Sequence, residues 1–173
     1  MKQVSLQTLN RILVVTVVIC VVGMALGTLF TLTDLPPVPN QIRTEDGTVL
    51  FTTDDITAGK EVFLKYNLMS YGTLLGNGAY YGPDYTAEYL SFVAEKVDVQ
   101  PASDLERVRQ SQPIDGVLHL PQWWAEVHTQ ARTHYEDFYV QGNIPAGVGP
   151  GTIPTAAEAH RFADYVAWTA WIS

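Results

Sequence analysis

The sequence predicts a mainly α-helical protein with one N-terminal transmembrane helix and a small β-hairpin. Three observations support this fold class. The run Ile12 to Leu32 has 21 residues and no charge. Asp46-Gly47 lies between short apolar and β-branched runs, a pattern typical of a tight hairpin. Further along the chain, segments with apolar residues at helical spacing follow capping residues and alternate with glycine- and proline-rich stretches.

The N-terminal run is long enough to cross a bilayer, because 21 residues of helix extend about 30 Å. Lys2 and Arg11 precede the run and Asp34 is the first charge after it, so the positive-inside rule predicts a cytoplasmic N-terminus. The alternative is a cleaved signal peptide, for which Ala25-Leu26-Gly27 is a poor cleavage site. We expect two parts: a cytoplasmic tail with a transmembrane helix (1–33) and an exported domain (34–173).

Charge divides sharply at this helix. All 18 acidic residues follow it with eight of the ten Lys and Arg, which gives the exported part a net charge of −10. Nucleic acid and anionic lipid are poor partners for such a surface. The acidity favours solubility, or the steering of a basic electron donor. The single cysteine, Cys20, lies in the apolar run, so the exported part holds no disulfide and its core must supply its stability.

After the apolar run, a stiff proline-rich linker spans Leu35 to Gln41, and the hairpin occupies residues 42–51. Asp54 or Asp55 is expected to cap a helix over residues 56–67. On that helix Glu61 and Lys65 have the spacing of an i,i+4 ion pair. Its inward-facing side chains are expected to be Val62, Phe63 and Tyr66.

A loop rich in glycine and tyrosine follows, from Ser70 to Pro83. Three of its glycines are expected to adopt backbone angles closed to other residues: Gly72, Gly76 and Gly78. Asp84 then has the position of an N-cap for a helix that reaches about Asp98.

The rest of the chain is predicted to be helical with one interruption. Ser103 and Glu106 form an S-x-x-E capping box that opens a short helix. Asp115-Gly116 followed by VLHL indicates a turn and a short strand. Pro121 suits the first turn of a longer helix that reaches about Tyr139. One stripe of that helix is expected to face the core: Trp124, Val127, Ala131, Tyr135 and Phe138.

Residues 142–154 hold four glycines and three prolines and are expected to form a loop. Thr155 and Glu158 make a second capping box, at the start of the last helix. The buried face of that helix is predicted to consist of Phe162, Ala163, Val166, Ala167 and Ala170.

The glycine-rich loop also carries a functional signal. Covalent haem c needs two thiols and an adjacent histidine ligand, in the pattern C-x-x-C-H. The segment AGKEVFLKYN is similar to the first helix of a cytochrome c, and TLLGNGAYYGP (73–83) is similar to the stretch that follows C-x-x-C-H in the small haem-c subunit of bacterial nitric oxide reductases. In this alignment Leu68 and Tyr71 stand at the cysteine positions and Gly72 stands at the histidine position, so the haem c motif is replaced.

The substituted pattern resembles the N-terminal region of quinol-dependent nitric oxide reductases, in which a cytochrome-c-like domain has lost its haem. The stretches FTTDDITAGKEVF, YGTLLGNGAYYGPDYTAEYL and FADYVAWTAW carry the resemblance. One position departs from the family, in which a histidine is common where Asn77 stands here. The family-motif residues are Gly76, Asn77, Gly78, Ala79, Tyr80, Pro83 and Asp84.

The resemblance implies part of an oxidoreductase that converts two NO to N2O in denitrification, respiration or NO detoxification. It implies a bacterial or archaeal cytoplasmic membrane, with the domain on the outer side. The family's catalytic core carries two b-type haems and a non-haem iron, takes electrons from quinol, and is expected to be a separate membrane subunit or a missing C-terminal bundle. This chain is expected to bind no cofactor and to have no catalytic residue.

Within such an enzyme the domain is expected to support the core, with Tyr71 filling the volume of the lost haem and with Glu88, Asp84 and Tyr80 available for interface hydrogen bonds. The alternative is a free-standing, membrane-anchored accessory module without catalytic activity.

Metal and hydrolytic chemistry are weaker hypotheses. His128 and His134 are six residues apart, so on one helix they point about 120° from each other. No H-E-x-x-H motif, G-x-S-x-G elbow, P-loop or dinucleotide fingerprint occurs in the sequence. The other two histidines are His119 and His160.

Overall fold

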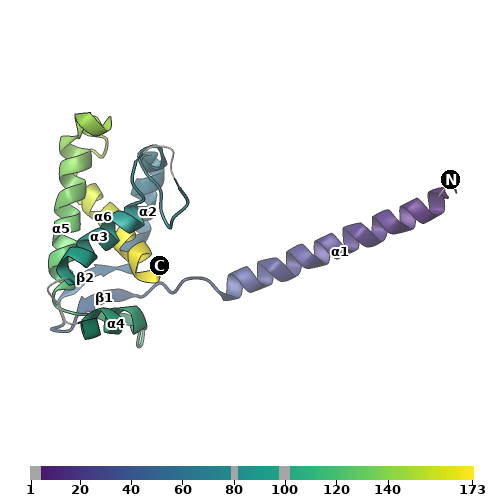
Figure 1. Cartoon of the computed structure of the whole chain (residues 1–173), viewed down its shortest axis with the longest axis horizontal. Helices are drawn as coiled ribbons and strands as arrows, with labels where there is room; N and C mark the ends of the chain where they lie inside the picture. Colours follow the sequence, from purple (N-terminus) through teal and green to yellow (C-terminus); the bar gives the residue numbers. More distant parts are fainter. Residues whose placement is uncertain (1–4, 79–81, 98–101) are drawn as a thin grey trace. The chain divides into compact units, whose positions relative to one another are not determined.

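A computed structural model describes residues 5–78, 82–97 and 102–173 of the chain. These residues form two compact units, Met1–Pro36 and Pro37–Ser173 (Figure 1). The fold is mainly α with a small sheet, as the sequence predicts.

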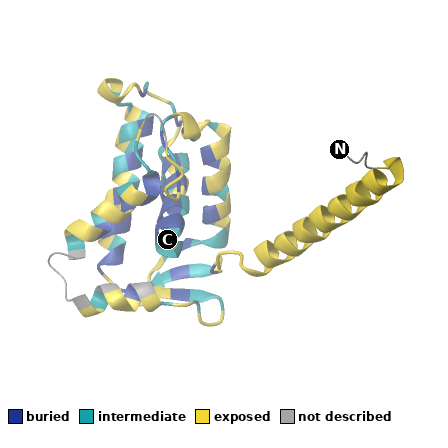
Figure 2. Ribbon diagram, turned by 45° about the vertical axis from the view of Figure 1, so that its right-hand side comes forward, coloured by how far each residue is buried: buried dark blue, intermediate teal, exposed yellow. Residues whose placement is uncertain are grey.

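The first unit is the helix α1, Leu6–Thr33, which is six residues longer at its N-terminal end than the uncharged run. Ser5 caps it by accepting a hydrogen bond from the backbone N–H of Thr8 at 3.2 Å. The helix is exposed along its whole length (Figure 2). The hydroxyls of Thr28 and Thr31 donate to carbonyls one turn earlier, which satisfies them within the helix. Its length and composition are compatible with a membrane span.

The predicted hairpin is confirmed. Strand β1, Gln41–Thr44, pairs antiparallel with β2, Val49–Thr52. At the turn Gly47 has a φ of +92°, which favours glycine, and the Asp46 carboxylate accepts a hydrogen bond from the Thr48 backbone at 3.0 Å.

The sheet is larger than the predicted hairpin. Strand β3, Val117–Leu120, is the predicted VLHL strand, and it pairs parallel with β1 to give the order β2-β1-β3. The hydrogen bond of the Asn40 N–H to the Gly116 carbonyl, at 2.7 Å, begins this pairing. The contact joins residues far apart in sequence, which local patterns do not reveal.

Helix α2 spans Thr53–Lys65 and begins three residues earlier than predicted. The predicted aspartate cap is wrong, because Thr52 is the N-cap. The Thr52 hydroxyl accepts from the Asp55 backbone, and the Asp55 carboxylate accepts from the Thr52 backbone, which completes a capping box. Asp54 lies in the first turn of the helix, where its charge complements the helix dipole.

The predicted Glu61–Lys65 pair is also replaced. The Lys65 ammonium lies 2.9 Å from Glu158 on α6, Ala156–Ile172, and the Tyr66 hydroxyl donates to the same carboxylate oxygen at 2.8 Å. Val62 and Phe63 are buried as predicted, whereas Tyr66 is only half-buried. The two helices approach so closely that a Cβ at Gly59 would lie 2.0 Å from the Arg161 carbonyl oxygen. Gly59 therefore sets the packing distance between α2 and α6.

Asp84 caps α3, Tyr85–Val97, as predicted, because its carboxylate accepts from the Ala87 backbone at 3.0 Å. Helix α4 spans Ala102–Gln110. Ser103 lies inside its first turn and is not the predicted N-cap.

Helix α5 spans Trp124–Glu136 and begins three residues after Pro121. A π-helical turn, Asp137–Gln141, continues it, and a short 3₁₀ helix, Ile144–Ala146, follows in the predicted loop. The π-turn shifts burial by one residue, so that Tyr139 is buried and the predicted Phe138 is only half-buried. The other four residues of the predicted stripe are buried.

Helix α6 is the centre of the second unit, and α2, α3 and α5 pack against it (Figures 1 and 2). Thr155 is its N-cap, as predicted, and accepts from the Glu158 backbone at 3.3 Å. The five residues predicted for its inner face are buried. A sixth buried residue, Asp164, is charged and was not expected there.

Candidate functional site

The residues that replace the haem c motif lie in a tight turn between α2 and α3. Leu68 opens a 3₁₀ helix, Leu68–Ser70, and its side chain is buried. Its carbonyl oxygen accepts from the backbone N–H groups of Tyr71 and Gly72, at 2.9 and 3.1 Å, and from the Tyr85 hydroxyl at 3.0 Å. The turn is therefore fixed from inside the core.

Gly72 is required here for space. A Cβ at this position would lie 2.6 Å from the Pro83 carbonyl oxygen and 2.6 Å from Cζ of Tyr85. The expectation of special backbone angles is wrong for Gly72, which is absent from the positive-φ glycines, and confirmed for Gly76 and Gly78, with φ of +71° and +67°. No side chain, and so no iron ligand, fits at position 72 while the Tyr85 ring keeps its place.

Tyr85 occupies the space behind the turn. It is fully buried, and its hydroxyl lies 2.7 Å from the Tyr139 hydroxyl. The rings of Phe63 and Phe162 meet its ring edge to face, at centroid distances of 6.3 and 5.1 Å. Burial raises the pKa of both tyrosines, so both phenols are neutral and can share one hydrogen bond.

Tyr71 has a smaller part in this packing than predicted. It is half-buried and meets Tyr139 edge to face at 6.2 Å. The aromatic side chains that fill the interior are fully buried: Tyr85, Tyr89, Tyr135, Tyr139 and Phe162. Tyr85 and Tyr139 thus fill the space that was assigned to Tyr71.

Covalent haem c does not fit these residues. Leu68 and Tyr71 offer no thiol, Gly72 offers no ligand, and aromatic rings fill the adjacent volume. Cys20 belongs to α1, in the other unit. Over the described part of the chain, no group of three His, Cys, Asp or Glu side chains lies close enough together to hold a metal ion.

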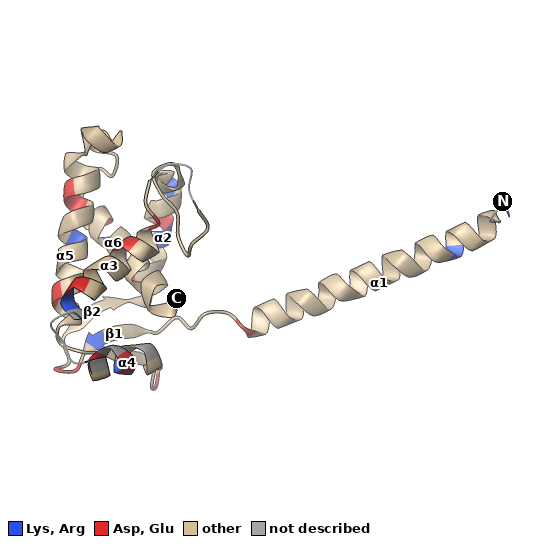
Figure 3. Cartoon of the chain, viewed as in Figure 1, with Lys and Arg blue, Asp and Glu red and all other residues tan. Residues whose placement is uncertain are grey.

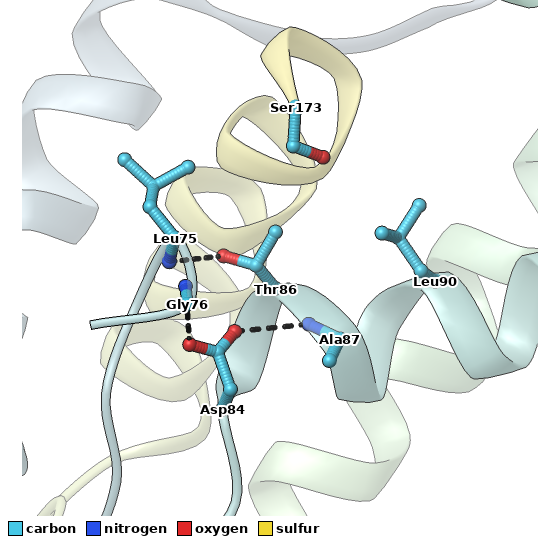
Figure 4. A pocket seen from close by; sticks show the side chains of 7 residues that line it. All are labelled: Leu75, Gly76, Asp84, Thr86, Ala87, Leu90 and Ser173. Carbon is cyan, nitrogen blue, oxygen red and sulfur yellow. Dashed lines mark hydrogen bonds between the residues drawn. The ribbon is translucent and has the colours of Figure 1, made fainter. Parts of the chain in front are cut away.

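The family-motif residues form a loop that Asp84 holds together (Figure 4). One Asp84 oxygen accepts from the Gly76 N–H at 2.7 Å and from the Thr73 hydroxyl at 3.2 Å, and the other accepts from Ala87. The Leu75 N–H donates to the Thr86 hydroxyl at 3.0 Å. The Asp84 carboxylate therefore organises the loop instead of pointing to a partner.

The other motif residues vary in their surroundings. The Pro83 carbonyl accepts from the Thr73 N–H at 3.0 Å, whereas Asn77 is exposed and its N–H contacts the Leu74 carbonyl at 3.3 Å. Ala79 and Tyr80 lie outside the described residues.

Each of three histidines contacts one carboxylate on another helix. Glu88, expected at an interface, lies 3.1 Å from Nε2 of His134. His160 lies 2.9 Å from Glu136. The third, His128, belongs to a buried cluster that the sequence analysis missed. The remaining histidine, His119, is exposed on β3.

The buried cluster lies between α5 and α6. Oδ1 of Asp164 accepts from Nε and Nη2 of Arg132, at 3.0 and 2.8 Å, and lies 2.9 Å from Nε2 of His128. Arg132 also donates to the Leu50 carbonyl on β2, and the Tyr89 hydroxyl on α3 lies 3.4 Å from Nδ1 of His128. Burial lowers the pKa of His128 and outweighs the opposing effect of Asp164. The only sequence signal was a charged residue within the apolar run FADYVAW.

The charges of the second unit are otherwise spread over its helices and turns (Figure 3). Several lie in exposed pairs, such as Lys96 with Glu126 at 2.8 Å and Arg107 with Asp104 at 2.7 Å. Exposed pairs of this kind contribute little to stability.

Residues 39–111 match the family model that describes the cytochrome c-like domain of the nitric oxide reductase protein NorB. The matched stretch contains β1, β2, α2, the motif loop, α3 and α4. No curated protein sequence matches the chain. The resemblance found in the glycine-rich loop is thereby confirmed, and residues 39–111 form a cytochrome c-like domain of the NorB family of nitric oxide reductases.

Proposed function

We propose that this chain is the haem-free, membrane-anchored region of a quinol-dependent nitric oxide reductase. The enzyme converts two NO to N2O and water, which takes two electrons and two protons, and one quinol supplies both. The observation that carries the proposal is the motif loop. It keeps the family pattern from Thr73 to Asp84, while the ring of Tyr85 occupies the place of an iron ligand.

In this proposal α1 spans the cytoplasmic membrane of a bacterium or archaeon with its N-terminus inside. Residues 34–173 then lie on the outer side. The uncharged surface of α1 supports a span, and Arg11 near its start and Asp34 after its end support the orientation.

The catalytic core is assigned to a membrane partner or bundle with two b-type haems and a non-haem iron. Quinol delivers electrons to that core directly, so the domain carries none of them. Its task is to cover the outer face of the core and to limit water access there. The aromatic interior around Tyr85 and Tyr139 suits a rigid support, because fully buried, interlocked rings have few alternative arrangements.

The test is co-purification of the tagged full chain from membranes of its native host. An optical spectrum, an iron assay and quinol-dependent NO consumption are measured on the isolated material. Recovery of a larger membrane protein with b-type haem, extra iron and NO consumption is the expected result. The chain recovered without such a partner would contradict the proposal and favour the free-standing accessory module.

A pair of variants links this result to the motif loop. Asp84→Ala removes the acceptor of three hydrogen bonds and is expected to reduce recovery of the partner. Asn77→Ala changes an exposed side chain of the same loop and is expected to leave recovery unchanged. Circular dichroism of both variants checks that the helices are retained.

A further inference from the structure

One end of the second unit presents apolar side chains to solvent. Leu75 is 50 % exposed and Leu90 is 39 % exposed. In Figure 4 the two side chains flank the last turn of α6, which ends at Ser173. We call this surface the apolar end and define it by Leu75, Leu90, Val93, Ala170 and Trp171.

The backbone at Leu75 is held in an unfavourable conformation. Its φ is +56°, in the left-handed region that a leucine seldom adopts, and this costs about 1 kcal/mol or more. Two hydrogen bonds hold it there: the Leu75 N–H donates to Thr86 and the Gly76 N–H donates to Asp84. The loop is thus built to keep an apolar side chain outside the core.

The surface between these side chains is hollowed. Two adjoining depressions share Leu90 and Ser173. The larger, of about 520 Å³, is lined by Val93, Trp124, Ala170 and Trp171 among others. Asp84 is the one charged side chain among the lining residues of the two depressions, and its carboxylate already accepts hydrogen bonds inside the loop. The apolar end therefore suits a neighbour without charge.

The same end receives the chain from α1. The indole N–H of Trp168 on α6 donates to the Pro37 carbonyl at 3.0 Å, three residues before Trp171. Helix α1 ends at Thr33, so four residues of chain separate it from Pro37. Four residues reach at most about 15 Å. If α1 spans a bilayer, this length of chain keeps the end of α6 near the bilayer surface.

We infer that the apolar end rests in the interfacial layer of the lipid bilayer that α1 spans. Tryptophan is enriched in that layer, and exposed leucines bury their apolar area there. The binding has no ionic part, because the apolar end offers no free charge and the exported part carries a net charge of −10. Zwitterionic lipid is therefore the matching surface. The inference rests on α1 as a membrane span and is independent of the NO reductase assignment.

Site-directed spin labelling of the full chain tests this. Cys20 is the single cysteine, so Cys20→Ser gives a background for one label at a time. Labels are placed at Leu75→Cys and Leu90→Cys. Ile144→Cys is the matched control, since Ile144 is an exposed apolar residue, 71 % exposed, in the loop beyond α5 at the opposite end of the unit (Figure 1). Val18→Cys, within α1, reports on the span itself.

The chain is reconstituted in phosphatidylcholine nanodiscs without other proteins, and collisions of each label with oxygen and with a water-soluble nickel chelate are measured. At Leu75→Cys and Leu90→Cys, nickel collisions are expected to be about threefold or more below those at Ile144→Cys, because ions are excluded from an apolar phase. Oxygen collisions are expected to rise. Added salt is expected to change neither value.

Labels at positions 75 and 90 that collide with nickel as often as the label at position 144 would overturn the inference. Protection that appears only in native membranes, with another protein bound, would also overturn it and assign the apolar end to that protein. Nickel access at Val18→Cys would show that α1 does not span, and this would refute both the inference and the proposed anchoring. Protection at positions 75 and 90 in pure lipid would support the inference even if co-purification yields no NO reductase.

Discussion

Nε2 of His128 lies 2.9 Å from Oδ1 of Asp164, and both side chains are 2 % exposed. Arg132 supplies the balancing positive charge through two hydrogen bonds to the same oxygen. The nearby carboxylate favours the His128 tautomer with its proton on Nε2, and Nδ1 is then left to accept from the Tyr89 hydroxyl. The cluster connects α3, α5, α6 and β2, and it is electrically neutral only while His128 is uncharged.

Stability is expected to fall as the pH drops below about 6.5, the ordinary pKa of histidine. The pKa of His128 is lowered in the folded state, so below pH 6.5 the unfolded chain binds a proton that the folded chain refuses. The loss approaches about 1.4 kcal/mol per pH unit. The groups that face His128 are Asp164, Arg132, Tyr89 and, more remotely, His160.

Urea unfolding of the full chain in detergent, between about pH 7.5 and pH 5, measures this dependence. His128→Gln is expected to reduce the slope of stability against pH, although it lowers stability overall. His119→Asn, on the exposed strand residue, is expected to keep the wild-type slope. An unchanged slope in His128→Gln would mean that another group titrates.

Asp164→Asn is expected to destabilise the fold by about 3 kcal/mol, because it leaves the Arg132 guanidinium without its buried counter-charge. The measurement is the free energy of unfolding at neutral pH. Glu126→Gln breaks an exposed pair with Lys96 and is expected to stay near wild type. Equal effects from the two variants would show that the buried cluster contributes no more than a surface pair.

The Tyr85–Tyr139 pair is expected to show strong coupling in a double-mutant cycle. Tyr139→Phe and Tyr85→Phe each leave one buried hydroxyl with fewer partners, at a cost of about 1–2 kcal/mol. Since Tyr85 also donates to the Leu68 carbonyl, its substitution is expected to cost more. The double variant should cost less than the sum of the two single variants. Strict additivity would rule out a shared hydrogen bond.

Gly72→Ala is expected to destabilise the fold by about 3 kcal/mol, because its Cβ would meet the Tyr85 ring and a backbone oxygen that cannot easily move. Gly149→Ala, where a Cβ meets nothing within 4 Å, is the matched control and should be nearly neutral. For the same reason, restoring the triple Leu68→Cys, Tyr71→Cys and Gly72→His should give no folded c-type cytochrome. A covalent haem spectrum from a stable triple variant would contradict this.

The sequence was sufficient for features encoded by a few neighbouring residues. Asp46-Gly47 predicted the hairpin, Asp84 predicted the start of α3, and Thr155 predicted the start of α6. It was insufficient where two candidates compete locally, as at α2, where Thr52 and not an aspartate became the N-cap.

Long-range contacts were the other limit. The pairing of β3 with β1 and the ion pair of Lys65 with Glu158 join residues that no short pattern connects. The motif predicted that no haem attaches here, but it did not reveal that Tyr85 fills the space. Asp164 was missed because periodicity assigns residues to faces by hydrophobicity, and a buried aspartate is acceptable only with partners such as Arg132 that the pattern does not show.

The π-turn at Asp137–Gln141 bears on how chains of this type are compared. A π-turn is what an α-helix forms when it absorbs one additional residue without disturbing its ends. Here it brings Tyr139 into the interior and leaves Phe138 at the edge. Removing one residue from this turn would return a phenylalanine to the inner position and abolish the phenol pair with Tyr85. A relative whose α5 is one residue shorter should therefore be aligned with a gap inside the helix, and its position opposite Tyr85 should be examined separately.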